Sequence, residues 1–186
     1  MTKSFKTFLK HTAKDFHNQS VNPPIVRAST IIFKSMNDIR KTQAKYKRDP
    51  RGGYFDYGRQ GTSTTHILQK ILSKLEESYY TFLTPTGFGA VFLAIFSVVR
   101  PGDEILTADP VYNPTRMLTQ DYLTDFGIKT IFYNPHDLSS IKKNITKKTK
   151  LIFVENPGSN TFEFQDLSKI IQIAKKNKII TAIDNT

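Results

Sequence analysis

The sequence contains no cysteine among its 186 residues. Disulfide bonds, cysteine-ligated zinc, iron–sulfur clusters and thiol nucleophiles are therefore excluded, because each of them needs a cysteine sulfur. This absence is consistent with a reducing compartment, and we expect a cytoplasmic protein. The 4 histidines are scattered without the spacing of metal ligands, so we expect no metal site.

Long hydrophobic runs are also missing. The longest stretch without a charged residue covers residues 78–99, but Pro85, Gly87 and Gly89 interrupt it. Only residues 88–99 remain as a continuous apolar segment, which is shorter than the roughly 20 residues that a membrane span needs. We therefore predict a buried core helix at this segment and no membrane partner.

Acidic residues are few relative to basic ones, with 16 Asp and Glu against 27 Lys and Arg, and the formal net charge is +11 at pH 7. A charge this positive can indicate binding to nucleic acid or to anionic membranes. Most of it comes from lysines in solvent-like runs such as residues 142–150 and 175–178, whereas bidentate contacts to bases and phosphates usually use arginine. We favour a solvated lysine-rich surface and no nucleic-acid partner.

Enough apolar side chains are present for a folded core, since 38% of the residues are hydrophobic and 12% are aromatic. Turn residues interrupt the first 60 residues, at NPP from Asn22 and at DPRGG from Asp49, which predicts an extended N-terminal arm. Leucine and isoleucine then recur at helical spacing over residues 63–78, which predicts a helix capped by Ser63 or Thr64.

Beyond this helix, short apolar runs alternate with segments of helical pattern. The runs are YYTFLT, EILTA, KTIFYN, LIFVE and IITAID. Such alternation predicts an α/β domain with a mainly parallel sheet. Ligands of these sheets bind at the carboxyl ends of the strands, so the positions of interest are residues 84–88, 109–113, 155–159 and 184–186.

Several single residues could carry chemistry at such positions. Gly87 lies at a strand-to-helix turn, where free N–H groups suit phosphate, although such a glycine by itself more often marks a plain tight turn. Tyr57 and Arg59 precede a helix and suit phosphate binding, yet such residues are often ordinary surface. Tyr112 could stack on a flat ligand or simply pack. Asp184 follows an apolar strand and needs a partner, such as a protonated ring nitrogen or an arginine.

Five motifs together resemble a known enzyme family. They are YGRQGTST, LTPTGFGAV, DPVYNPTR, LIFVENPGS and AIDNT, in this order. Each is weak evidence alone, but their combination is specific. From about residue 22 to residue 186, the sequence resembles the Cys/Met-metabolism family of pyridoxal 5′-phosphate (PLP) enzymes, and the resemblance implies PLP as cofactor.

The resemblance also implies a fold and an assembly. The expected fold is an N-terminal arm over residues 1–60, followed over residues 61–186 by an incomplete PLP-dependent transferase-like (fold type I) large domain with a mainly parallel sheet. Enzymes of this family are homo-oligomers with active sites at subunit interfaces. The implied substrate is a small sulfur-containing amino acid.

The resemblance assigns roles to the phosphate-binding candidates by matching position. Tyr57 and Arg59 would reach the cofactor phosphate of a neighbouring subunit. Gly87 and Phe88 would offer backbone N–H groups to the phosphate at the start of a helix. These four residues are therefore expected to bind the cofactor.

Two further residues are expected at the cofactor ring. Tyr112 would stack on the pyridine ring and lie near the reacting α-carbon, so it is expected both to bind the cofactor and to act in catalysis. Asp184 would pair with the ring nitrogen and keep it protonated, which lets the ring act as an electron sink.

One element of the family pattern is not found in these residues. The Schiff-base lysine of the family lies in a motif downstream of the Asp-Asn-Thr segment, and the sequence ends at Thr186. None of its lysines lies in a matching motif, and covalent catalysis needs a positioned amine. We therefore expect the 186-residue chain to be inactive by itself.

Within the family, the sequence is most similar to the cystathionine β-lyase branch. The γ-acting enzymes usually have a Tyr-x-Arg-x-x-Asn-Pro-Thr pattern where this chain has YGRQGT, and Asn followed by Pro where it has Ser159. The implied activity is carbon–sulfur cleavage of cystathionine to homocysteine, pyruvate and ammonia, a trans-sulfuration step of methionine biosynthesis. A γ-acting enzyme (cystathionine γ-synthase or γ-lyase type) and a non-catalytic basic binding protein are the alternatives.

Overall fold

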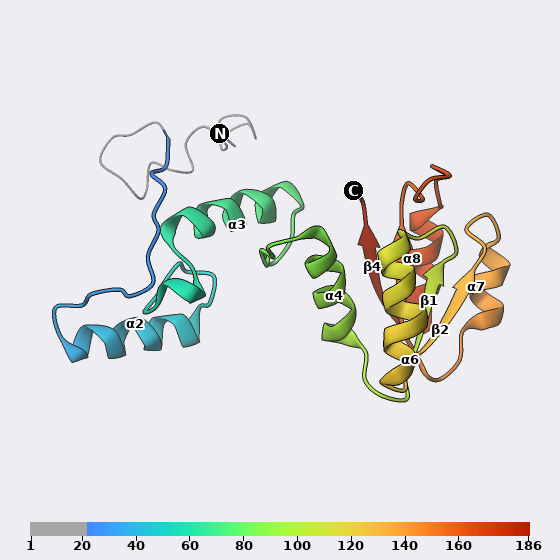
Figure 1. Ribbon diagram of the computed structural model, residues 1–186, viewed down its shortest axis with the longest axis horizontal. Helices are drawn as coiled ribbons and strands as arrows, with labels where there is room; N and C mark the ends of the chain where they lie inside the picture. The colour runs from blue at the N-terminus through green and yellow to red at the C-terminus, as the bar shows by residue number, and fades with distance from the viewer. Residues whose placement is uncertain (1–21) are drawn as a thin grey trace. The chain divides into compact units, whose positions relative to one another are not determined.

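The computed structural model describes residues 22–186. The chain forms two compact units, of which the first ends at Leu83 and the second is Thr84–Thr186 (Figure 1). Residues 61–83, which we expected as part of the large domain, belong to the first unit. The predicted start of the large domain of the enzyme family at residue 61 is a different boundary, and it stays a prediction. Residues 1–21 of the expected arm lie outside the described residues.

The first unit contains a helix that the sequence analysis did not predict. Helix α2 spans Met36–Arg48, and the side chain of its N-cap Ser35 accepts a hydrogen bond from the backbone N of Asp38 at 3.2 Å. None of its residues is buried, and its sequence MNDIRKTQAKYKR contains few apolar side chains, so the hydrophobic signal for a helix is weak. The expected arm is thus partly helical.

Helix α3 confirms the helix that the sequence predicts over residues 63–78. Helix α3 spans Ser63–Leu75, and the short 3₁₀ helix η2 (Gly58–Gln60) precedes it. The cap is Thr62 rather than Ser63 or Thr64. The backbone N of Thr62 donates to Thr65 Oγ1 at 2.9 Å, as part of a reciprocal capping box.

The second unit is built on the predicted parallel sheet. Its four strands have the order β2-β1-β3-β4, and every neighbouring pair is parallel. The strands are β1 (Glu104–Ala108), β2 (Lys129–Tyr133), β3 (Thr149–Glu155) and β4 (Ile180–Asp184). The run YYTFLT forms no strand, whereas the other four apolar runs do.

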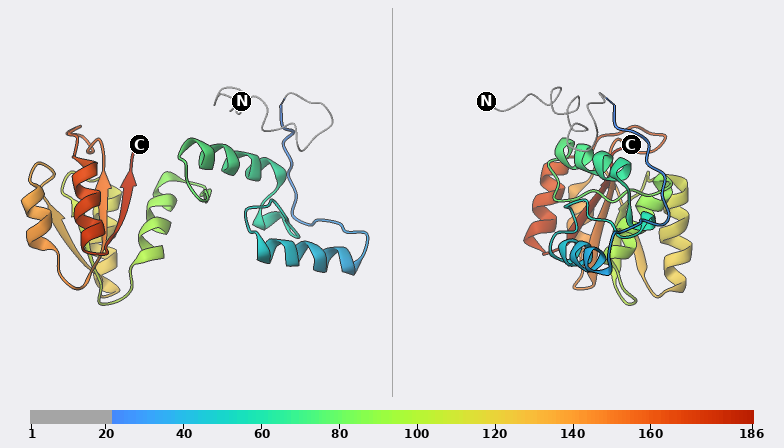
Figure 2. Two further views of the ribbon diagram at one scale, coloured as in Figure 1. Left: turned by 180° about the vertical axis from the view of Figure 1, so that it is seen from behind. Right: turned by 90° about the vertical axis from the view of Figure 1, so that its left-hand side faces the viewer.

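Helices connect and cover these strands, as Figures 1 and 2 show. They are α4 (Gly87–Val98), α5 (Asn113–Met117), the π-helix η3 (Leu118–Tyr122), α6 (Leu123–Asp125), α7 (Leu138–Asn144) and α8 (Leu167–Lys176). Helices α5, η3 and α6 follow one another without a break, where the sequence predicts one helical segment. Helix α7 occupies part of the lysine-rich run that we interpreted as solvated surface.

Two apolar cores lie on opposite faces of the sheet because successive strand residues point to opposite sides. Ile105 of β1 and Phe153 of β3 join a core with α4 and the α5–α6 segment. Leu106 and Ile152, one position away, join a core with α7 and α8. The result is a sheet between two helical layers, with the carboxyl ends of all strands at one edge.

Helix α4 is less buried than its sequence predicts. Val91 and Ile95 are buried against the sheet, but Phe88, Phe92 and Leu93 are exposed. A helix that is apolar all round was expected to be surrounded by protein. Here only one face packs on the sheet. Among the described residues, no helix is long and apolar enough to cross a membrane.

Candidate cofactor site

A cavity of about 830 Å³ lies at the carboxyl end of the sheet in the second unit. Its lining comes from the start of α4, the start of α5, the ends of β3 and β4, and the loop after β3. Gly87, Phe88, Tyr112 and Asp184 all line it. The structure therefore brings together four of the six residues that the sequence analysis selected, at the edge of the sheet where parallel sheets bind ligands.

The start of α4 forms one wall of this cavity. The N-cap Thr86 accepts a hydrogen bond at Oγ1 from the backbone N of Gly89 at 3.0 Å. The first N–H groups of a helix have no partner within the helix, and they attract anions. A Cβ placed on Gly87 would meet nothing within 4 Å, so the space beside this turn is open. The wall is suited to a phosphate.

Tyr112 presents an exposed aromatic ring to the same cavity. It is the N-cap residue of α5, and 48% of its surface is exposed. Its backbone N donates a hydrogen bond to Glu155 Oε2 at 2.7 Å. The neighbouring Pro110 accepts at its backbone O from Ser159 N at 2.9 Å. The loop that carries the ring is thus fixed from two sides, and the ring stays available for stacking.

An arginine–aspartate pair further anchors the first turn of α5. Arg116 Nη2 donates to Asp109 Oδ1 at 2.6 Å and also to the backbone O of Asp109. The Arg116 guanidinium lies 4.0 Å from the ring centroid of Phe132 in β2. The pair joins the end of β1 to the helix that begins after Tyr112, and so limits the movement of the Tyr112 ring.

Asp184 is the last residue of β4, as its sequence position predicts. Its Oδ1 accepts hydrogen bonds from the backbone N and the Oγ1 of Thr186, at 3.0 and 2.6 Å. Its backbone O accepts from Asn156 N at 3.0 Å. These bonds orient the carboxylate at the cavity, where it could accept a hydrogen bond from a protonated ring nitrogen.

Glu155 lies in one of the ranges of interest, residues 155–159, but the sequence analysis assigned it no role. It is the last residue of β3 and pairs in register with Asp184 of β4. Only 8% of its surface is exposed, and its carboxylate holds the Tyr112 loop. The signal that identified Asp184, a carboxylate at the end of an apolar strand, was equally present at Glu155.

A buried glutamine supports the end of β3 from behind. Gln165 Nε2 donates to the backbone O of Glu155 at 3.0 Å, and its Oε1 accepts from the Tyr133 hydroxyl at 2.9 Å. Burial raises the pKa of Tyr133, so this hydroxyl stays protonated and remains a donor. The end of the strand therefore has a fixed position below the cavity.

Tyr57 and Arg59 lie in the first unit, around η2. The Tyr57 hydroxyl is hydrogen bonded to Ser29 Oγ at 2.9 Å, and the Arg59 guanidinium lies 5.1 Å from the Tyr57 ring centroid. Between them, a Cβ on Gly58 would collide with the backbone O of Ala28. Only glycine fits this close approach. The two side chains thus form one group, and their contact with a cofactor phosphate stays a prediction.

The cavity of the second unit fits a flat, phosphorylated ring. It has a helix start for the phosphate, an exposed aromatic ring for stacking and a carboxylate for a ring nitrogen. Its volume also lies within the range of ~300–1,000 Å³ that is usual for small-molecule sites. The chemistry of this donor set matches PLP, the cofactor that the sequence motifs imply.

Comparison with known proteins agrees with this class of site. Residues 6–186 match the family described as Cys/Met metabolism PLP-dependent enzyme. The chain belongs to this family. The family depends on PLP, and the α/β fold with its parallel sheet is that of the fold type I PLP-dependent enzymes.

Individual relatives carry different names. Cystathionine β-lyase of Haemophilus influenzae is 36% identical over 175 residues, which are 93% of this chain and 43% of that protein. L-alanine/L-glutamate racemase of Wolbachia pipientis is 32% identical over 173 residues, which are 90% of this chain and 42% of that protein. The chain spans less than half the length of these relatives.

A solved structure from Campylobacter jejuni shares the fold. It is of a protein assigned to the O-acetylhomoserine (thiol)-lyases, with a TM-score of 0.85 and 28% sequence identity. The match covers 100% of this chain and 45% of that chain. That protein contains N′-pyridoxyl-lysine-5′-monophosphate.

Proposed function

We propose that this chain contributes the cofactor-binding part of a carbon–sulfur lyase that cleaves cystathionine at its β-carbon. The reaction consumes water and yields homocysteine, pyruvate and ammonia, as a trans-sulfuration step of methionine biosynthesis in the cytoplasm. The observation that carries the proposal is the cavity in which the start of α4, the Tyr112 ring and the Asp184 carboxylate meet. This combination suits PLP.

The residues of this chain would hold the cofactor at both of its ends. The backbone N–H groups of Gly87 and Phe88 would bind the phosphate, assisted by the positive end of the α4 dipole. Tyr57 and Arg59 would reach the phosphate of a neighbouring subunit in a homo-oligomer. The Arg59 guanidinium can form two parallel hydrogen bonds to phosphate oxygens.

Tyr112 and Asp184 would set the position and the electronic state of the ring. The Tyr112 ring would stack on the pyridine and lie beside the α-carbon of the substrate. The Asp184 carboxylate would accept a hydrogen bond from the ring N–H, and its negative charge would keep the ring nitrogen protonated. When bound, PLP supplies an electron sink for the bond-breaking steps at the substrate. Glu155 would act through Tyr112, by holding its backbone N.

The preference for β-elimination rests on two sequence details. They are the YGRQGT segment and Ser159, which lines the cavity. Because the named activities of the relatives differ, overall similarity does not select one reaction. A γ-acting enzyme of the same family is the second candidate. The two reactions are distinguished by the product that carries the sulfur atom of cystathionine. Cleavage at the β-carbon gives homocysteine, and cleavage at the γ-carbon gives cysteine.

Cofactor binding by the 186-residue chain tests the site itself. PLP is titrated into the chain and binding is followed by changes in PLP absorbance and by equilibrium dialysis. Asp184→Asn should weaken binding, because the neutral amide lacks the negative charge that stabilises a protonated ring nitrogen. Asp137→Asn, at the N-cap of α7 and outside the cavity, removes the same charge and should leave binding unchanged. Equal affinities for the chain and both variants would contradict the proposed role of Asp184.

Turnover tests the reaction. The 186-residue chain should not release pyruvate from cystathionine faster than free PLP does, because none of its lysines lies in the family's lysine motif. A protein that also contains the lysine segment of the family should release pyruvate and homocysteine in equal amounts. Release of cysteine instead of homocysteine would favour the γ-acting alternative.

A further inference from the structure

The first unit contains a cavity of its own, with a volume of about 530 Å³. One face of α3 forms its base, Arg51 borders it from the turn after α2, and the segment after α3 closes one side. Tyr57 and Arg59 do not line it. The proposed cofactor function gives this cavity no role.

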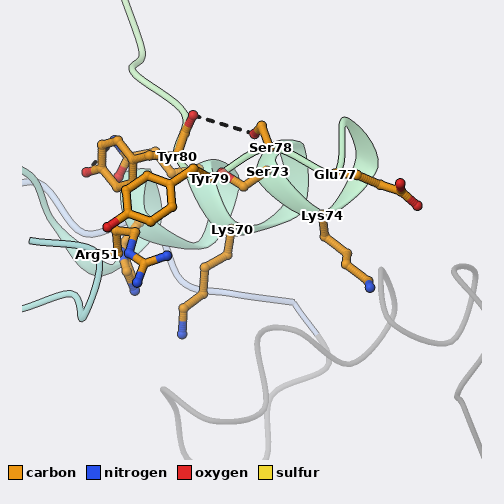
Figure 3. A pocket seen from close by; sticks show the side chains of 10 residues that line it. Arg51, Lys70, Ser73, Lys74, Glu77, Ser78, Tyr79 and Tyr80 are labelled. Carbon is orange, nitrogen blue, oxygen red and sulfur yellow. Dashed lines mark hydrogen bonds between the residues drawn. The ribbon is translucent and has the colours of Figure 1, made fainter. Parts of the chain in front are cut away.

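Basic side chains outnumber acidic ones in the lining of this cavity. Arg51, Lys70 and Lys74 line it, against Glu77 as the acidic side chain. Figure 3 shows the three basic side chains extending on the same side of α3, while Glu77 points in another direction. Asp49 offsets part of the charge, since its Oδ1 lies 3.7 Å from Arg51 Nε. Among the described residues of the lining, Lys70 and Lys74 add two further positive charges.

The two lysines of the lining lie one turn apart on α3. Lys70 and Lys74 are four residues apart on α3, where like charges are neighbours and destabilise the helix. The positive field also extends to the base of the cavity. Burial lowers the pKa of His66, and the charge of Lys70 lowers it further. A phosphate close to both lysines would interact favourably with their positive charges.

An aromatic ring borders the basic group. Tyr79 is 78% exposed, and the Arg51 guanidinium lies 4.0 Å from the centroid of its ring. The segment that carries Tyr79 is tied to α3 by side chains. Gln69 Nε2 donates to the backbone O of Thr81 at 3.0 Å, and Ser73 Oγ is hydrogen bonded to Thr81 Oγ1 at 2.8 Å. The ring therefore lies two residues before a point at which the segment is tied to α3.

We propose that this cavity binds a small phosphorylated compound with a flat aromatic ring, its phosphate between Arg51, Lys70 and Lys74 and its ring against Tyr79. Ammonium and guanidinium groups together provide the charge-assisted hydrogen bonds that phosphate oxygens accept. An exposed tyrosine beside them offers a surface for ring stacking. The site is separate in residues from those proposed for PLP.

The test compares three probes on the 186-residue chain by titration calorimetry. Pyrophosphate measures phosphate recognition, and AMP against ribose 5-phosphate measures the contribution of an aromatic ring. The charge-removing variant Lys70→Gln/Lys74→Gln should weaken pyrophosphate binding about tenfold or more. The control Lys142→Gln/Lys143→Gln removes the same charge from α7 and should change the affinity less than twofold. Far-UV circular dichroism verifies that both variants keep their helices.

The outcomes separate a built site from general attraction to a basic protein. Equal weakening in both double variants, or no binding of pyrophosphate to the unchanged chain, would overturn the proposal. AMP should bind more tightly than ribose 5-phosphate, and Tyr79→Leu should abolish this difference. Equal affinities for AMP and ribose 5-phosphate would overturn the role of the ring. PLP is itself a phosphorylated compound with a flat ring, so the Asp184→Asn comparison is also made in the Lys70→Gln/Lys74→Gln background. The effect of Asp184 should persist there, so failure of either proposal can be recognised by itself.

Discussion

Arg59 provides a sharp test at the scale of one side chain. If its guanidinium pairs with the cofactor phosphate across a subunit interface, Arg59→Ala removes a charge-assisted hydrogen bond, for which about 1.5–3 kcal/mol is typical. PLP affinity should then fall roughly 10- to 150-fold. Arg59→Lys should recover only part of the loss, because an ammonium keeps the charge but not the planar fork.

The Arg59 measurement belongs in a protein that also contains the family's lysine segment, where PLP titration can be followed by the absorbance of the bound cofactor. Lys41→Ala, on the exposed surface of α2, is a suitable control for loss of one positive charge. Unchanged affinity in both Arg59 variants would remove this residue from the site. It would also weaken the assignment of Tyr57, whose ring the Arg59 guanidinium faces.

His66 should make the stability of the first unit depend on pH. Burial, and then the charge of Lys70, lower its pKa below the ordinary value of 6.5. As the pH falls through about 6.5, the unfolded chain therefore binds a proton that the folded chain does not, which favours unfolding. The stabilisation is complete above this pH and is lost progressively towards the lower, folded-state pKa.

The pH effect can be measured locally by hydrogen exchange of the α3 amides. Their protection should decrease between pH 7.5 and 5.5 after correction for intrinsic exchange rates. His66→Gln should flatten this dependence, because the amide side chain does not titrate in this range. His136→Gln, at an exposed position, should leave it unchanged. The same pH dependence with and without His66 would show that another group controls it.

The site residues that could be predicted are those that lie at the end of a strand or at the start of a helix, because that position places them at the ligand-binding edge of the sheet. Tyr112 and Asp184 follow apolar strands, so the parallel sheet brings them to one edge. Glu155 satisfies the same rule but was assigned no role. Its partner is the backbone N of Tyr112, 43 positions earlier, and a tertiary contact of this kind leaves no local pattern.

At the scale of elements, the helical spacing of leucine and isoleucine identified α3, and short apolar runs between helical segments identified the four strands. Helix α2 was missed because its sequence contains few apolar side chains. The run YYTFLT has the composition of a strand. Its Thr81, however, is hydrogen bonded through its backbone O and its hydroxyl to side chains of α3. Local composition could not reveal that these tertiary contacts replace strand pairing.

The junction between β3 and α5 depends on one carboxylate. Glu155→Ala would leave the backbone N of Tyr112 without its acceptor at 2.7 Å, in a part-buried position. Removing one partner of such a bond typically costs about 1–3 kcal/mol. Glu155→Gln keeps an acceptor oxygen and should cost less. Urea unfolding followed by circular dichroism measures the free energy of unfolding of both variants. Equal stability of the alanine and glutamine variants would contradict the role of this hydrogen bond.

At the scale of the whole molecule, the second unit leaves apolar surface exposed on two elements. Strand β4 has β3 as its partner on one side and forms an edge of the described sheet, where Ile180 is 53% exposed. On α4, Leu93 is 45% exposed. Free strand edges and apolar patches of this kind promote association between chains. We therefore expect the 186-residue chain to self-associate as its concentration rises.

Charges placed on these two elements should reduce the association. Lysine at a strand edge is a common protection against edge-to-edge pairing, so Leu93→Lys/Ile180→Lys should shift the sedimentation coefficient towards that of the monomer. The control Ile25→Lys/Ile32→Lys adds the same charge at exposed positions of the first unit. Equal effects of the two double variants would indicate that net charge, rather than this surface, controls association. A monomer at every concentration of the unchanged chain would show that neither exposed element binds a second copy.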